Sequence, residues 1–186
     1  MHPGLFQMKA SRPPRVRLEA ASTAHEEAFL SAVRRSVALH HPWITAPRSS
    51  ARFRRYIAHH TGDRHLSYFA FSPAGELVGV INVSEIVRGI FRSAYLGYCA
   101  FMPHQGYGYM TAALTRVVTE CFGKYRLHRL EANIQPGNQR SIRLVKRLGF
   151  RKEGYSERYL KVGGRWRDHE RWAITREAWK GRNQSR

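Results

Sequence analysis

A glycine-rich segment between an apolar strand and an amphipathic helix constrains this chain more than any other feature. The segment reads Gln105-Gly106-Tyr107-Gly108-Tyr109-Met110 and follows an apolar run that ends at Phe101. Glycines let bare backbone N–H groups approach an anion at a helix N-terminus, where the aligned peptide dipoles also favour negative charge. The segment therefore predicts a phosphate site, with a pyrophosphate as the expected guest, although ordinary strand-to-helix turns use glycine too.

The helix that follows has one continuous apolar face. Its apolar residues recur at the i, i+3, i+4, i+7 spacing that packs a helix against a core. Because the loop is attached to a buried helix, we expect the loop to be rigid. The residues of this face are Met110, Ala113, Leu114, Val117, Val118, Cys121 and Phe122.

Length and cysteine content indicate one domain without disulfides. A chain of 186 residues can bury a single core, and Cys99 and Cys121 fall within a predicted strand and helix, as small buried hydrophobes do. We expect a domain over residues 15–179, with flexible tails at 1–14 and 180–186. No apolar run has membrane-spanning length and no secretory signal is recognised, so we expect a cytoplasmic protein without a membrane partner.

The charge and the histidines bear on the partners of the chain. A formal net charge of +19 indicates attraction to a polyanion such as ribosomal RNA or the phosphates of a cofactor, or else simply an arginine-rich, solvated surface. The cationic residues are spread over the whole chain and form no ordered nucleic-acid motif. Ten histidines are present, but no His or Cys pair has zinc-ligand spacing, so no metal site is expected.

The remaining pattern predicts a mixed α/β domain with one sheet. Thr23 is a plausible N-cap of a helix over residues 25–37, Ser49 or Ser50 of a second helix, and Asn138 of a helix that ends at Gly149. The predicted strands cover residues 16–20, 66–71, 77–83, 94–101, 129–134, 155–162 and 165–174, with a tight turn at Gly163-Gly164 between the last two.

These residues resemble the GCN5-related N-acetyltransferase (GNAT) superfamily. Its acetyl-CoA motif, Arg/Gln-x-x-Gly-x-Gly/Ala, is matched from Gln105 through Tyr109, and Met110 departs from it at the last position. The block from Asn138-x-x-Ser141 to Leu148-Gly149-Phe150 is similar to the superfamily's helix after the fifth strand. The resemblance narrows to the RimJ type of ribosomal-protein-alanine N-acetyltransferase, in which Met at this position is acceptable, over about residues 15–179. The blocks that carry it further are Tyr95-Leu96-Gly97-Tyr98, Glu153-Gly154-Tyr155 and Trp166-Arg167-Asp168-His169.

The resemblance implies a mostly antiparallel mixed sheet, flanked by helices and splayed between its fourth and fifth strands, 94–101 and 129–134. Acetyl-CoA is the implied co-substrate, with its pantetheine arm in the gap beside strand four and its pyrophosphate on the glycine loop. Gln105 would cover the phosphates and Asn138 would face the pantetheine or the reaction centre. The implied acetyl-CoA residues are Phe101, Met102, Gln105, Gly106, Tyr107, Gly108, Tyr109, Met110, Asn138 and Ser141.

The implied reaction moves an acetyl group from a thioester to a primary amine. Many family members carry a tyrosine acid where this chain has Val145, so Ser141, one helical turn earlier, is the nearest hydroxyl that could protonate the leaving thiolate, unless it only helps to cap the helix. The strand-four glutamate that many relatives use as a base is absent. Glu131 and Asn133 share one face of strand five and are candidates, although either side chain could simply face solvent. Weaker candidates are Glu85, Asp168 and His169.

The implied acceptor is the N-terminal α-amine of a protein, foremost a small-subunit ribosomal protein, with ribosome or rRNA contact through the basic surface. An α-amine, with a pKa of about 7.7–8.0, needs only a mild base. Two alternatives stay open: an acetyltransferase of a small amine or amino acid, and a non-enzymatic ribosome- or RNA-associated factor on the same fold. The positive charge disfavours polycationic acceptors. Trp43 either lines the acceptor entrance or is a core residue.

Overall fold

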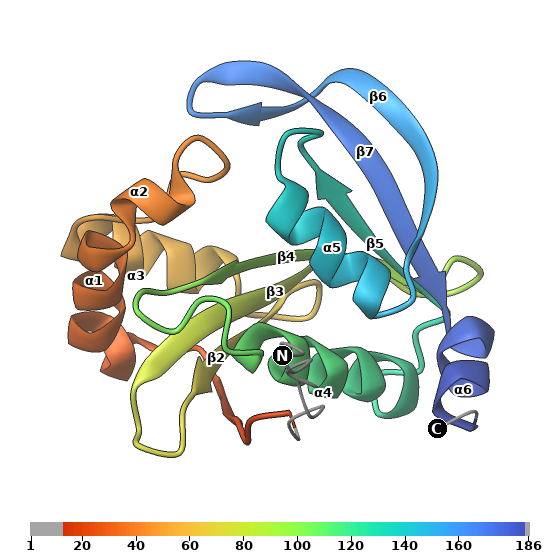
Figure 1. The fold of residues 1–186 in the computed structure, drawn as a ribbon, viewed down its shortest axis with the longest axis horizontal. Coiled ribbons are helices and arrows are strands. Elements are labelled where there is room, and N and C mark those ends of the chain that lie inside the picture. The colour runs from red at the N-terminus through yellow and green to blue at the C-terminus, as the bar shows by residue number, and fades with distance from the viewer. Residues whose placement is uncertain (1–12, 185–186) are drawn as a thin grey trace, which may run out of the picture.

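One seven-stranded sheet runs through the molecule (Figure 1). The computed structural model describes residues 13–184, so residues 1–12 of the expected N-terminal tail lie outside the described part. The strand order is β1-β2-β3-β4-β5-β7-β6, and every neighbouring pair is antiparallel except β4 and β5. The strands are β1 (Arg17–Ala20), β2 (Leu66–Phe71), β3 (Leu77–Val87), β4 (Ser93–Ala100), β5 (Arg129–Ile134), β6 (Arg151–Val162) and β7 (Arg165–Thr175).

Helices cover both faces of this sheet and divide the core in two. On one face, Phe29 and Phe53 pack with Phe69 of β2 and with Phe101. On the other face, helices α4 and α5 bury their apolar residues against β3, β4 and β5. The helical segments are η1 (Thr23–His25), α1 (Glu26–Arg35), α2 (Val37–His40), α3 (Ser50–His59), α4 (Tyr109–Gly123), α5 (Gln139–Arg147) and α6 (Arg176–Gln184). The predicted mixed sheet with flanking helices is confirmed.

The two parallel strands separate soon after they begin. Their register pairs only Ser93–Tyr95 of β4 with Arg129–Glu131 of β5, so the rest of β4 has no partner on that side. A parallel ladder that ends this early leaves backbone N–H and C=O groups of β4 facing an opening in the sheet. This is the splay that the sequence predicted, and it fixes the place of the main cleft described below.

Several local predictions need correction. Thr23 does not cap a helix, because a 3-10 turn covers Thr23–His25 and α1 begins at Glu26. The predicted helix over 25–37 is interrupted at Ser36, whose hydroxyl donates to the Ala32 carbonyl (2.7 Å). At the other end of the chain, α6 covers Arg176–Gln184.

Candidate active site

A cleft of about 890 Å³ opens where β4 leaves β5, and we call it the main cleft. Four parts of the chain wall it: the end of β4, the loop and first turn leading into α4, the helix α5, and α2 with the loop that follows it. Of the residues that the sequence assigned to the site, the structure brings together Gln105, Gly106, Gly108, Tyr109, Met110, Asn138 and Ser141.

The glycine loop has the backbone geometry of an anion site. Gly106 and Gly108 have φ of +88° and +85°, a region that side-chain-bearing residues rarely adopt. Gly108 is the N-cap of α4, and the first intrahelical bond runs from the Ala112 N–H to the Gly108 carbonyl (3.1 Å). The preceding N–H groups have no acceptor inside the helix, so they can donate to an anion at its N-terminus. Oε1 of Gln105 is buried there without a partner among residues 13–184.

Met110, the departure from the glycine motif, is accommodated by a glycine on β3. A Cβ at Gly79 would collide with the Met110 sulfur and would lie 2.9 Å from the Cys99 carbonyl oxygen, so the glycine leaves room for the Met110 side chain as it is placed. Tyr107 points the other way: it is 72% exposed and does not line the cleft.

The backbone groups that face the gap belong to Tyr98 and Ala100 and not to Phe101. The Phe101 N–H donates to the Val78 carbonyl (2.9 Å) on β3, and its side chain is fully buried in the core. The Met102 N–H donates to the Ser36 hydroxyl (2.9 Å). Phe101 and Met102 therefore lie outside the main cleft, and their assignment to acetyl-CoA stays a prediction. Because backbone groups alternate in direction along an antiparallel pair, those of Tyr98 and Ala100 turn away from β3, toward the gap.

His40 forms a hydrogen bond with one of these backbone groups. Its Nε2 donates to the Ala100 carbonyl (2.9 Å), and the ring is 6% exposed on the wall of the cleft. Burial lowers the pKa of His40, against the opposing effect of this hydrogen bond, so the ring is neutral at pH 7. The adjacent pair His40-His41 gave no sign of this role, because the contact joins residues sixty positions apart.

Tyr98, whose role the sequence left open, lies beside Ser141, the candidate acid. The hydroxyls of Tyr98 and Ser141 are 2.7 Å apart, and Ser141 N donates to the Asn138 side-chain oxygen (3.2 Å), the predicted helix cap. Burial raises the pKa of Tyr98 to about 12, while the hydrogen bond with Ser141 acts to lower it. Tyr98 therefore stays protonated at neutral pH and can donate to Ser141, which leaves the Ser141 proton free for the cleft.

The two candidates for a base on β5 lie outside the main cleft. Glu131 accepts a hydrogen bond from Nε of Arg129 (2.8 Å), and the same guanidinium also pairs with Glu153. Oδ1 of Asn133, one pleat further along the same face, is buried and has no partner among the described residues. Glu131 is thus engaged by a cation, whereas Asn133 keeps an acceptor free.

The weaker base candidates are dispersed. Glu85 forms an ion pair with Arg64, far along β3 from the cleft. His169 is 3% exposed and its Nδ1 bonds to the Arg167 carbonyl (2.9 Å). Asp168 accepts from the Tyr155 hydroxyl (2.7 Å).

One wall of the main cleft is strongly cationic. Arg140, Arg143 and Arg147 of α5 all line it, at intervals that place them along one side of the helix. No ion pair joins these three to a carboxylate within residues 13–184. Ligands with several negative charges fit such a wall.

The loop after α2 forms the far wall, and Trp43 anchors it. Its ring lies 3.0 Å from the position that a Cβ on Gly137 would take, and its carbonyl accepts from Gln135 Nε2 (3.1 Å). Trp43 is only partly buried and lines the cleft, in agreement with the acceptor-entrance alternative.

Two further features of residues 13–184 bear on membrane and metal partners. None of their helices combines the length and apolar character needed to cross a bilayer. They hold no cluster of three or more His, Cys, Asp or Glu side chains placed to bind a metal ion.

Comparison with known proteins assigns the family. The sequence matches the acetyltransferase (GNAT) domain over residues 15–151. The chain therefore belongs to the GNAT acetyltransferase family, and the splayed sheet with its glycine loop is the fold that this family implies.

Individual relatives narrow the comparison. The chain is 45% identical over 104 residues to the ribosomal protein uS5-alanine N-acetyltransferase of Escherichia coli (strain K12), covering 56% of this chain and 54% of that protein. It is 37% identical over 112 residues to the probable N-acetyltransferase YjcK of Bacillus subtilis (strain 168), covering 60% and 61%. These matches thus span little more than half the length of the curated relatives.

Solved structures match over most of the chain. Mycobacterium smegmatis RimJ in complex with CoA-disulfide superposes with a TM-score of 0.82 at 28% identity, covering 91% of this chain and 88% of that one. The spermidine N-acetyltransferase of Vibrio cholerae, in complex with CoA and spermine, gives a TM-score of 0.75 at 19% identity, over 89% and 98%, and so shares the fold.

Proposed function

We propose that this protein transfers the acetyl group of acetyl-CoA to the N-terminal α-amine of a protein, and that the acceptor is a ribosomal protein. The observation that carries the proposal is the Tyr98–Ser141 hydroxyl pair, which lies at the point where β4 leaves β5. The names of the Escherichia coli and Mycobacterium smegmatis relatives support the choice of acceptor.

The residues present fit acetyl-CoA. The N–H groups of the glycine loop and the first turn of α4 suit a pyrophosphate, and the arginines of α5 add positive charge beside it. Backbone groups of Tyr98 and Ala100 suit an amide-bearing arm, with the Ala100 carbonyl already used by His40. When bound, acetyl-CoA supplies an activated thioester. A β4 N–H in the gap is suited to donate to the thioester carbonyl oxygen.

Ser141 is the proposed proton donor to the departing sulfur. The Tyr98 hydroxyl forms a hydrogen bond with the Ser141 oxygen, and the Asn138 side chain accepts from the Ser141 backbone N–H. Only a weak general base is needed, because an α-amine with a pKa of about 7.7–8.0 is already partly deprotonated at neutral pH. We therefore propose that no single strong base acts, because both candidates on β5 lie outside the main cleft: Glu131 is paired with Arg129, and the Oδ1 of Asn133 is buried.

The acceptor class is tested by release of free CoA thiol in the presence of different amines. The panel contains an alanine-starting peptide, the same peptide with a blocked N-terminus, spermidine, free alanine and buffer alone. We expect turnover with the free N-terminus and little with the others. Equal turnover with the blocked peptide, or faster turnover with spermidine, would contradict the proposal, and acetyl-CoA binding by calorimetry serves as the folding control.

A further inference from the structure

A second, smaller cavity of about 280 Å³ lies on the other side of Trp43. It is walled by two tryptophans, Trp43 and Trp166, by the turn of residues 135–137, and by Arg167 and Asp168 of the β6–β7 hairpin. Trp43 and Gly137 line both cavities, so the two openings adjoin at this contact. Figure 1 shows the hairpin arching over α5 toward the loop that follows α2.

Arg167, which lines this cavity, carries an unsatisfied donor. Its Nε is buried and has no hydrogen-bond partner within residues 13–184. The neighbouring carboxylate does not pair with it; the two Asp168 oxygens accept instead from the Tyr155 hydroxyl (2.7 Å) and the Arg158 N–H (2.8 Å). A buried N–H without an acceptor costs free energy that a ligand or a water molecule must offset.

The surroundings indicate the chemistry of that ligand. A guanidinium forms its strongest hydrogen bonds with carboxylates, often through two parallel N–H groups. Trp166, which is 61% exposed, and Trp43 offer aromatic surface for the apolar part of a side chain. The net charge of +19 attracts an acidic segment and repels a polyamine.

We propose that the small cavity binds the acceptor peptide just beyond its reacting amine, and that Arg167 selects an acidic side chain there. This inference rests on the proposed function, since it takes the main cleft as the place of acetyl transfer. An extended peptide advances about 3.3–3.6 Å per residue. The adjoining cavity is therefore within reach of the second, third or fourth residue of the acceptor.

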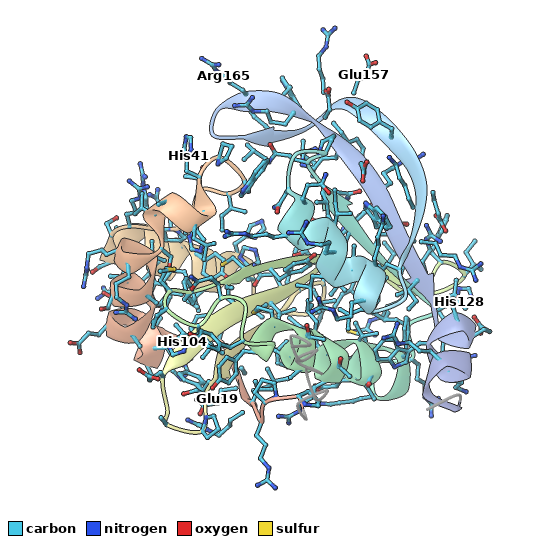
Figure 2. The ribbon with its side chains drawn as sticks, viewed as in Figure 1. Glu19, His41, His104, His128, Glu157 and Arg165 are labelled. Carbon is cyan, nitrogen blue, oxygen red and sulfur yellow. The ribbon has the colours of Figure 1, made fainter. Side chains whose placement is uncertain are left out.

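The test is a scan of acceptor peptides against matched variants. Glu is placed at the second, third or fourth position of a neutral alanine-starting peptide, one position at a time, and each peptide is compared with its Gln counterpart. The enzymes are the wild type, Arg167→Gln and Arg165→Gln. Arg165 lies on the same strand, is exposed, and points away from the body of the molecule at the hairpin tip, so its variant controls for the loss of one charge (Figure 2).

At one position we expect Glu to raise kcat/KM about tenfold over Gln, as a charge-assisted hydrogen bond would. The gain should vanish in Arg167→Gln and persist in Arg165→Gln, with acetyl-CoA affinity unchanged in both. Equal rates for Glu and Gln at all three positions would overturn the proposal, as would a preference that survives Arg167→Gln. Inhibition of the wild type by a short RNA that spares Arg167→Gln would assign the cavity to RNA and also overturn it.

The outcome also separates this inference from the proposed function. If every peptide is acetylated equally, only the role of Arg167 fails. If none is acetylated although acetyl-CoA binds, the proposed function itself fails.

Discussion

Replacing Ser141 by alanine tests the proposed acid with little disturbance of the helix. The cap contact uses the Ser141 N–H and the Asn138 side chain, so alanine preserves it. What alanine removes is the hydroxyl that faces Tyr98 at 2.7 Å. Loss of one well-placed donor in an active site typically lowers kcat about 10²- to 10³-fold. We expect that loss with acetyl-CoA affinity nearly unchanged.

The same substitution has a calculable structural cost. It leaves the Tyr98 hydroxyl buried without its partner, which is worth about 1–3 kcal/mol of stability. For a domain of this size, that corresponds to a decrease in Tm of about 2–12 °C. Tyr98→Phe removes the other half of the pair. It leaves the Ser141 proton but not its orientation, so kcat should fall only about 2- to 12-fold, the equivalent of one ordinary hydrogen bond.

The assay is single-turnover acetyl transfer at saturating peptide, with acetyl-CoA affinity from calorimetry and Tm from thermal melts. Thr115→Ala serves as the control, because it removes a helix hydroxyl that donates to the Thr111 carbonyl (2.8 Å) and does not line the main cleft. If Ser141→Ala keeps the full chemical rate, the Ser141 hydroxyl is not the acid. If Tyr98→Phe is slower than Ser141→Ala, the assignment of the donor between the two is reversed.

Four further outcomes are expected. Gly108→Val should weaken acetyl-CoA binding in calorimetry, because φ of +85° strains a β-branched residue and its Cβ would lie 3.2 Å from Pro14; unchanged affinity would exclude the loop as the phosphate site. Arg143→Gln combined with Arg147→Gln should reduce affinity for acetyl-CoA more than for its analogue lacking the 3′-phosphate, and equal losses would refute the electrostatic role of this wall. The pH profile of kcat should show no alkaline decline below about pH 10, since the pKa of Tyr98 is raised to about 12 and its hydroxyl keeps its proton. Burial lowers the pKa of His40 from 6.5, so the unfolded chain binds this proton more readily and the free energy of unfolding falls as the pH drops below about 6.5. Chemical denaturation at several pH values should show a smaller fall for His40→Gln, and an equal fall in both proteins would contradict this.

The sequence predicted the parts of the fold that are encoded locally. Gly149 and the pair Gly163-Gly164 have the positive φ values that their turns required, and Asn138 makes the predicted cap contact. The local sequence pattern did not predict the structure where contacts with distant parts of the chain determine it. The helix over residues 25–37 is interrupted at Ser36, whose N–H donates to the Val33 carbonyl and whose hydroxyl accepts from the Met102 N–H, a partner that no periodicity reveals.

The site was predicted as a set of segments more than as a set of contacts. The glycine loop and Ser141 were identifiable because motif spacing carries them. The role of Tyr98 depends on α5 packing against β4, and that of His40 on α2 reaching the end of the same strand. The alternation of backbone groups was not readable from the sequence: the Phe101 N–H turns toward β3, whereas that of Ala100 faces the gap.

The central claim is that this chain acetylates protein N-termini, and mass spectrometry of ribosomal-protein N-termini tests it most directly. Ribosomes are compared from cells that express the wild-type chain, the Ser141→Ala variant or no copy. The account predicts one ribosomal protein whose α-amine is acetylated with the wild type, strongly reduced with the variant and unmodified without the gene. Identical N-terminal acetylation in all three samples would contradict it.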